Sequence, residues 1–226
     1  MSATLQACRN CGAGAPLDAH FCPQCTKILP LARGRDYFSF MGLPRKLAMN
    51  ASDLETRFRS LSRQFHPDYF YNASAAERLA SLERSSFLND AYRTLRNPPA
   101  RLEYLLKLEG LAPKGPEEAA RQVPAALLEE VFALNEELDE IRSLREGGAP
   151  AEEWKQRLER ARRPIETKRD EHEMQIESLS AQWDSAVDGG ATDAERRAVL
   201  EALQERFLER NYIINLLAGI ERELSS

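Results

Sequence analysis

Apolar residues recur with the period of an α-helix over most of the chain. The first clear stripe starts at Leu54, within a segment where Ser52 and Glu55 have the spacing of a capping box. The helix must end before Pro67, whose ring cannot continue it. Its members fall at i, i+4, i+7 and i+11 and are Leu54, Phe58, Leu61 and Phe65. We therefore expect an amphipathic helix here.

Two further helices are predicted before a linker at residues 110–116. One covers residues 73–96 and carries the small Ser81 and Ser85 on its apolar side, where small side chains let a neighbouring helix approach closely. The other is short and follows two consecutive prolines; its apolar residues are Leu102, Leu105 and Leu106.

Three long helical stretches follow the linker, at residues 124–146, 151–187 and 192–224. Short connections that contain glycine separate them, so consecutive helices should be antiparallel neighbours in a three-helix bundle. Thr192 and Glu195 form a capping box at the start of the last helix. Pro164 is expected to interrupt and kink the middle one.

The composition agrees with a helical protein. The chain has 226 residues, of which 42% are hydrophobic and 30% charged, a composition that argues against a β-sandwich and a disordered chain. The net charge of −5 gives no overall positive field for binding nucleic acid. There is no apolar run of about eighteen residues and no secretory or transit pattern at the start, so a cytoplasmic protein of bacterial type is expected, without membrane contact.

All four cysteines lie near the N-terminus. They form two C-x2-C pairs, Cys8 with Cys11 and Cys22 with Cys25, separated by ten residues. Such pairs present four thiolates to one tetrahedral ion, and a site closed by four thiolates is typical of structural zinc. Two disulfides or free thiols are the alternatives, and iron fits the same ligands.

A His-Pro-Asp tripeptide follows the first amphipathic helix. The tripeptide consists of His66, Pro67 and Asp68, and Asp36-Tyr-Phe opens the segment. The helix carries a local basic face formed by Arg57, Arg59 and Arg63. This arrangement resembles the J-domain, which implies binding to a DnaK-type chaperone and stimulation of its ATP hydrolysis. The alternatives are a solvated arginine face and a simple turn.

A hydrolase that uses His66 and Asp68 is disfavoured. The sequence has no nucleophile elbow and no glycine-rich phosphate loop to accompany them. We therefore expect the protein to modulate another enzyme and not to be an enzyme itself.

In the stretch 124–146, two apolar residues lie outside the core stripe. Leu128 and Phe132 fall beside Glu136 and Glu140 on one strip of the helix, whereas the core stripe consists of Leu127, Val131, Leu134, Leu138 and Ile141. Apolar residues flanked by carboxylates suggest a partner-binding patch. The alternatives are that another helix covers them or that they are isolated surface residues.

The motifs together are similar to the HscB family, the J-type co-chaperones of iron–sulfur cluster assembly. The similarity rests on Asp36-Tyr-Phe, Arg63-Gln-Phe-His-Pro-Asp68, Arg101-Leu-Glu-Tyr-Leu-Leu-Lys-Leu108 and Asn135-Glu-Glu-Leu-Asp-Glu140. It implies an HscA or DnaK-type chaperone and an IscU-type scaffold protein as partners. The scaffold contacts it implies are Leu128, Phe132, Glu136, Glu140 and Phe207. Phe207 also fits a core stripe with Leu200, Leu203, Ile214 and Leu217.

The sequence thus predicts an all-α protein with three parts. These are a tetracysteine zinc knuckle or ribbon at residues 1–33, a helical J-domain at 36–110 and a scaffold-binding three-helix bundle at 118–226, in a monomer or weak dimer. Two other functions stay open at this point. One is a general J-protein for misfolded clients, and the other is a rubredoxin-like iron or redox module fused to a J-domain.

Overall fold

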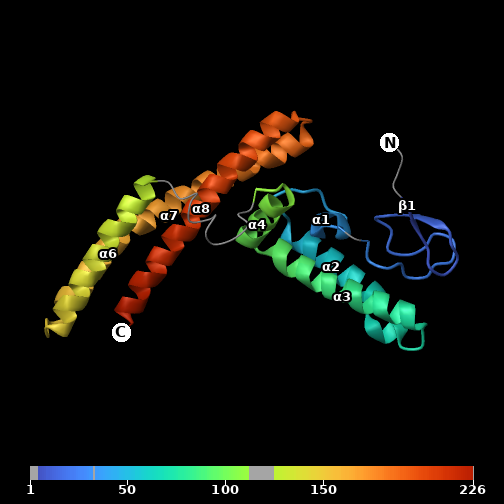
Figure 1. Cartoon of the computed structure of the whole chain (residues 1–226), viewed down its shortest axis with the longest axis horizontal. Helices are drawn as coiled ribbons and strands as arrows, with labels where there is room; N and C mark the ends of the chain where they lie inside the picture. The colour runs from blue at the N-terminus through green and yellow to red at the C-terminus, as the bar shows by residue number, and fades with distance from the viewer. Residues whose placement is uncertain (1–4, 33, 112–124, 226) are drawn as a thin grey trace. The chain divides into compact units, whose positions relative to one another are not determined.

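The computed structural model describes residues 5–32, 34–111 and 125–225, without the side chains of residues 125–128 and 130 (Figure 1). The chain divides into two compact units, Met1–Leu108 and Glu109–Ser226, which are described separately. Apart from two short strands and an isolated bridge, the regular structure of the described residues is helical, which confirms the all-α class. None of the described helices is long and apolar enough to cross a membrane.

The first unit consists of a small β-hairpin followed by helices. The strands pair antiparallel, with Gln6 opposite Ala15. In chain order the elements are β1 (Leu5–Ala7), β2 (Gly14–Pro16), α1 (Tyr37–Phe40), α2 (Ala51–Phe65), the 3-10 helix η1 (Pro67–Phe70), α3 (Ala75–Arg96) and α4 (Pro98–Leu108).

The helix starts of this unit differ in part from the prediction. The capping box at Ser52 is wrong, because Asn50 caps α2 and its side chain accepts the N–H groups of Ser52 and Asp53. Glu55 pairs with Arg59 instead. A capping box that the sequence analysis missed, between Ser74 and Glu77, starts α3 two residues later than predicted.

The core of the first unit lies where α1, α2 and α3 meet. Its buried residues include Phe38, Phe40, Leu54, Phe65 and Leu88. Ile28 belongs to the same cluster and comes from residues 5–32, here called the cysteine segment. A second, smaller cluster surrounds the cysteines themselves and consists of Cys8, Ala15, Cys22 and Leu29. The cysteine segment therefore contributes Ile28 to the core of the helices and has a small cluster of its own.

The second unit is a bundle of α6 (Ala125–Glu146), α7 (Ala151–Asp188) and α8 (Asp193–Leu224). The predicted capping box is present at Thr192 and Glu195. The predicted interruption at Pro164 is wrong, since α7 continues through the proline. The common core consists of Leu134, Leu138, Ile141, Trp154, Leu158 and Ile220.

The three helices of the bundle differ in length. At 1.5 Å per residue, the 22 residues of α6 span about 33 Å and the 38 residues of α7 about 57 Å. The end of α7 and the start of α8 consequently extend beyond α6 as a two-helix arm (Figure 1). Of the two neighbouring isoleucines on α8, Ile213 is buried, whereas Ile214, which the sequence placed in the core stripe, is only half-buried.

Candidate functional site

The four cysteines converge at one point of the first unit. The Sγ atoms of Cys8 and Cys25 lie 3.6 Å apart, those of Cys11 and Cys22 lie 3.7 Å apart, and all four lie within 4.8 Å of one another. All four are free thiols, so the disulfide alternative is wrong for this structure. A tetrahedral ion with Zn–S bonds of about 2.3 Å requires sulfur atoms about 3.8 Å apart, so these side chains fit such an ion.

Two similar turns build this cluster. The N–H of Gly12 donates to the carbonyl of Cys8, and the N–H of Thr26 donates to the carbonyl of Cys22, each over 2.9 Å. Both residues have positive φ, 73° for Gly12 and 58° for Thr26. The hydrogen bond from the Lys27 backbone N–H lowers the pKa of Cys25 to about 6, so its thiolate, the form that binds metals, exists at neutral pH.

His20 is not part of the sulfur cluster. Its Nδ1 lies 2.7 Å from Nη1 of Arg84 on α3. Burial lowers the pKa of His20 to about 4, with a further contribution from the charge of Arg84, so the ring is neutral and accepts this hydrogen bond. His20 therefore joins the cysteine segment to the helices.

Arg84 is the centre of that junction. Its side chain is 0% exposed, and its guanidinium donates to the carbonyls of Leu29 over 2.7 Å and of Pro30 over 3.1 Å. Burial lowers the pKa of Arg84 to about 10, which still leaves it charged at neutral pH. A charge is thus buried where the cysteine segment meets α3.

The His-Pro-Asp loop lies at the end of α2. His66 ends that helix, Pro67 opens η1, and Nδ1 of His66 accepts the N–H of Asp68 over 3.4 Å. The side chains of His66 and Asp68 are both exposed. The loop therefore presents an imidazole and a carboxylate to solvent on a short, rigid turn.

The three arginines of α2 have different surroundings. Arg57 donates to the carbonyls of Met41 and Gly42, Arg59 pairs with Glu55 over 2.6 Å, and Arg63 is exposed in the last turn. The predicted basic face is present, although Arg57 also helps to hold the loop after α1.

The second unit carries the predicted apolar and acidic strip on α6. Phe132 is 67% exposed, so no other described helix covers it, and Glu136 and Glu140 are exposed on the same helix. Glu140 accepts a hydrogen bond from Arg157 of α7. The side chain of Leu128 lies outside the described residues. Phe207 is only 9% exposed, in agreement with its alternative assignment to the core.

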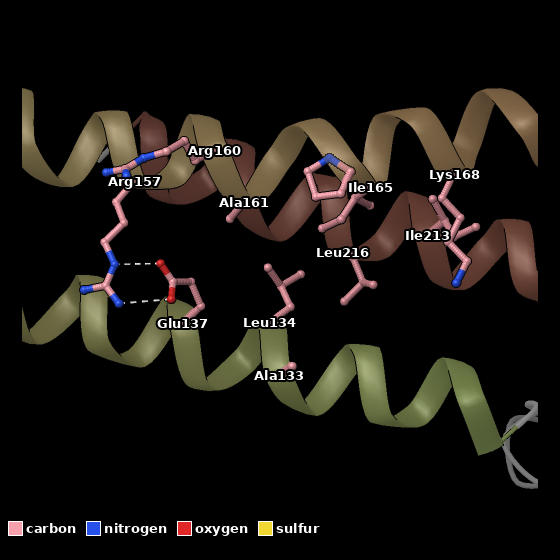
Figure 2. A pocket seen from close by; sticks show the side chains of 11 residues that line it. Ala133, Leu134, Glu137, Arg157, Arg160, Ala161, Ile165, Lys168, Ile213 and Leu216 are labelled. Carbon is pink, nitrogen blue, oxygen red and sulfur yellow. Dashed lines mark hydrogen bonds and ion pairs between the residues drawn. The ribbon is translucent and has the colours of Figure 1, made fainter.

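A groove runs beside this strip, between α6 and the other two helices (Figure 2). It encloses about 620 Å³, and apolar side chains such as Leu134, Ile165 and Leu216 line it. At one end Arg157 reaches across and binds Glu137 through two hydrogen bonds, of 2.6 and 3.0 Å (Figure 2). This ion pair joins α6 to α7.

Comparison with solved structures gives the family context. The human co-chaperone protein HscB is 28% identical, with 96% of this chain and 98% of that chain covered and a TM-score of 0.66. The chaperone HscB from Vibrio cholerae is 25% identical, with 84% and 98% covered and a TM-score of 0.54. The chain is HscB-like in fold and in sequence. No family model matches it.

The HscB likeness confirms the resemblance that the motifs indicated. It supports a J-type co-chaperone role for this HscB-like chain. The four clustered cysteines support metal binding. Sequence reasoning missed Arg84 and Arg157, because each finds its partners more than fifteen residues away and no local pattern marks them.

Proposed function

We propose that this HscB-like protein is a co-chaperone that stimulates the ATPase of a DnaK or HscA-type chaperone and delivers an IscU-type scaffold to it, promoting iron–sulfur cluster assembly and transfer. The observation that carries the proposal is the exposed His66-Pro67-Asp68 loop at the end of α2 within an HscB-like fold. The protein itself catalyses no reaction in this scheme.

The loop and the helix before it would bind the chaperone together. Arg59 and Arg63 would attract an acidic surface of the chaperone, and Pro67 would keep His66 and Asp68 in place, so that little conformational entropy is lost on binding. Charge attraction of this kind mainly raises the association rate and weakens with salt.

The exposed strip of α6 would bind the scaffold. Phe132 offers a large apolar side chain beside Glu136 and Glu140, a combination suited to a partner surface with an apolar pocket and basic groups. Leu128 and Phe207 would also contact the scaffold.

For the metal site we propose one structural zinc ion held by Cys8, Cys11, Cys22 and Cys25. Bound zinc would supply folding energy to a segment with few large apolar residues, and it would take no part in redox chemistry. A red, iron-containing preparation without zinc would instead favour the rubredoxin-like alternative. Metal analysis and the visible spectrum of the freshly purified protein distinguish the two.

The decisive experiment measures chaperone ATPase activity with and without the scaffold. His66→Gln should abolish stimulation, because it removes the imidazole from the loop while leaving the exposed surface otherwise similar. Lys107→Gln, an exposed change at the end of α4, is the control and should stimulate like the wild type. Full stimulation by His66→Gln would refute the co-chaperone proposal.

A second experiment tests the scaffold surface. Phe132→Ala should weaken scaffold binding at least about tenfold, equivalent to about 1.4 kcal/mol, because an exposed aromatic anchor is lost. Met174→Ala is the matched control, since Met174 is a 62% exposed apolar residue of α7 in the same unit. Scaffold affinity can be measured by calorimetry. Equal affinity for both variants and the wild type would favour a general J-protein or another contact surface.

A further inference from the structure

The segment that carries the cysteines touches the chain on both sides of the His-Pro-Asp loop. Before the loop, the ring of Phe65 lies 4.9 Å from the His20 ring and 6.0 Å from the Phe21 ring, measured between centroids. After the loop, Nζ of Lys27 lies 3.0 Å from Oε1 of Glu77, the residue that completes the cap of α3. The loop is thus bracketed by contacts with residues 20–27, the part of the segment that contains two of the four cysteines.

Phe65 is held by its ring and by its backbone. Its side chain is fully buried, and its carbonyl accepts hydrogen bonds from the hydroxyls of Ser81 over 2.6 Å and of Ser85 over 2.9 Å. Since Phe65 directly precedes His66, its position fixes where the loop begins. The Phe65 ring contacts the cysteine segment and also Phe40 of α1, whereas the Phe65 carbonyl is held by α3.

Arg84 connects these two supports. Its Cζ lies 5.5 Å from the centroid of the Phe65 ring, and within the described residues its hydrogen-bond partners are three carbonyls and the ring of His20, all on the cysteine segment and none a carboxylate. A buried charge is tolerated only where such groups replace its water. If the segment moves away, the guanidinium must leave the core or remain without partners, and either change disturbs the packing around Phe65.

We propose that the cysteine segment positions the His-Pro-Asp loop, with Arg84 and Phe65 as the positioning residues that link the two. Metal binding would order the loop by keeping the cysteine segment folded against α3. The consequence for chaperone stimulation rests on the proposed function above, whereas the positioning itself is a property of the free protein.

The test follows amide hydrogen exchange in the free, full-length protein. The N–H of Tyr69 donates to the His66 carbonyl, and that of Tyr71 to the Asp68 carbonyl, so both amides report on the folded loop. Removing the metal with a chelator and a reductant should speed their exchange at least about tenfold. Unchanged exchange at both amides would overturn the proposal.

Variants of Arg84 separate loop positioning from metal binding. Arg84→Met should retain the metal, because it leaves the four cysteines in place, yet it should speed exchange at Tyr69 and Tyr71 about as much as chelation does. Arg93→Met is the control, an exposed arginine of the same helix, and should leave exchange unchanged. A metal-loaded Arg84→Met protein with wild-type exchange would overturn the proposal.

If Arg84→Met proves unfolded by circular dichroism, Ser85→Ala provides the second variant. It removes one hydrogen bond to the Phe65 carbonyl from a half-buried site and should speed exchange at Tyr69 without loss of metal; wild-type exchange would count against the proposal. Chaperone ATPase activity measured in parallel distinguishes the proposed co-chaperone function from the proposed positioning of the His-Pro-Asp loop. If wild-type protein does not stimulate ATPase although chelation speeds exchange, the proposed function fails and the positioning stands.

Discussion

Thr192 and Glu195 show how two side chains define the start of a helix. The Thr192 hydroxyl accepts the Glu195 N–H, and the Glu195 carboxylate accepts the N–H and hydroxyl of Thr192, over 2.8 and 2.7 Å. The hydrogen bond from the Thr192 side chain is the main cause that lowers the pKa of Glu195. The carboxylate is therefore more stable in the folded state than in the unfolded one, and its contribution to stability is present above the ordinary glutamate pKa.

A pH series on the bundle tests this cap. Glu195→Gln should lower the free energy of unfolding at pH 7, and its difference from the wild type should vanish as the pH falls through the lowered pKa. Thr192→Ala should cost about 1 kcal/mol at pH 7. Urea unfolding followed by tryptophan fluorescence gives these values. Glu177→Gln, an exposed change within α7, is the control and should show little difference at either pH.

Local sequence patterns predicted the structural roles of some residues of this protein but not of others. The four cysteines and the box at Thr192 were predicted, because their partners lie within a few positions or form a recognised spacing. The box at Ser52 was wrong, because Asn50 lies two residues earlier and caps the helix instead. No local pattern marks Arg84, since its partners come from a segment more than fifty positions away.

At the scale of elements, α7 tolerates a proline within its length. Pro164 cannot donate the backbone hydrogen bond that a helix residue normally provides, yet α7 is continuous from Ala151 to Asp188. The side chain of Pro164 is exposed and is one of the residues that line the groove between α6 and the other two helices. Packing against α6 and α8 therefore outweighs the local preference to break the helix.

Replacing this proline should stabilise the bundle. Pro164→Ala restores the missing donor and removes the ring, and we expect a gain of about 1 to 3 kcal/mol in the free energy of unfolding. Ser178→Ala, at another exposed position of α7, isolates the effect of helix propensity and should gain at most about 0.5 kcal/mol. Urea unfolding of both variants makes the comparison. A Pro164→Ala protein no more stable than Ser178→Ala would show that the proline is accommodated without cost.

The boundaries of the three long helices followed from the sequence, because proline, glycine and apolar periodicity act locally. Observed α6, α7 and α8 each begin or end within one residue of the prediction. The helix lengths, and with them the two-helix arm, could therefore be predicted. The groove could not, because it depends on how side chains of α6, α7 and α8 pack against one another.

At the scale of the whole molecule, the two units carry different spectroscopic probes. Both tryptophans, Trp154 and Trp183, lie in the second unit, whereas five of the six tyrosines lie in the first. Tryptophan fluorescence therefore reports only on the bundle. Tyrosine fluorescence reports mainly on the unit that contains the cysteines.

Metal removal should consequently affect one probe and spare the other. A chelator with a reductant should lower the midpoint of the tyrosine-monitored thermal transition by about 10 °C or more, because Ile28 of the cysteine segment belongs to the core of the helices in the first unit. The tryptophan-monitored transition should stay in place. The double variant Cys8→Ser/Cys22→Ser should start at the lower midpoint and not respond to the chelator. A tryptophan midpoint that shifted equally would contradict this division.

The buried guanidinium of Arg84 also has a consequence for evolution. A lineage that lost the cysteine segment would lose the Leu29 and Pro30 carbonyls that hold the charge, so selection would act at position 84 as well. We expect homologues without the segment to carry an uncharged residue there. The residue at position 84 would then show the order of the two changes: the arginine would have appeared in the core only after the cysteine segment was present to bind its guanidinium.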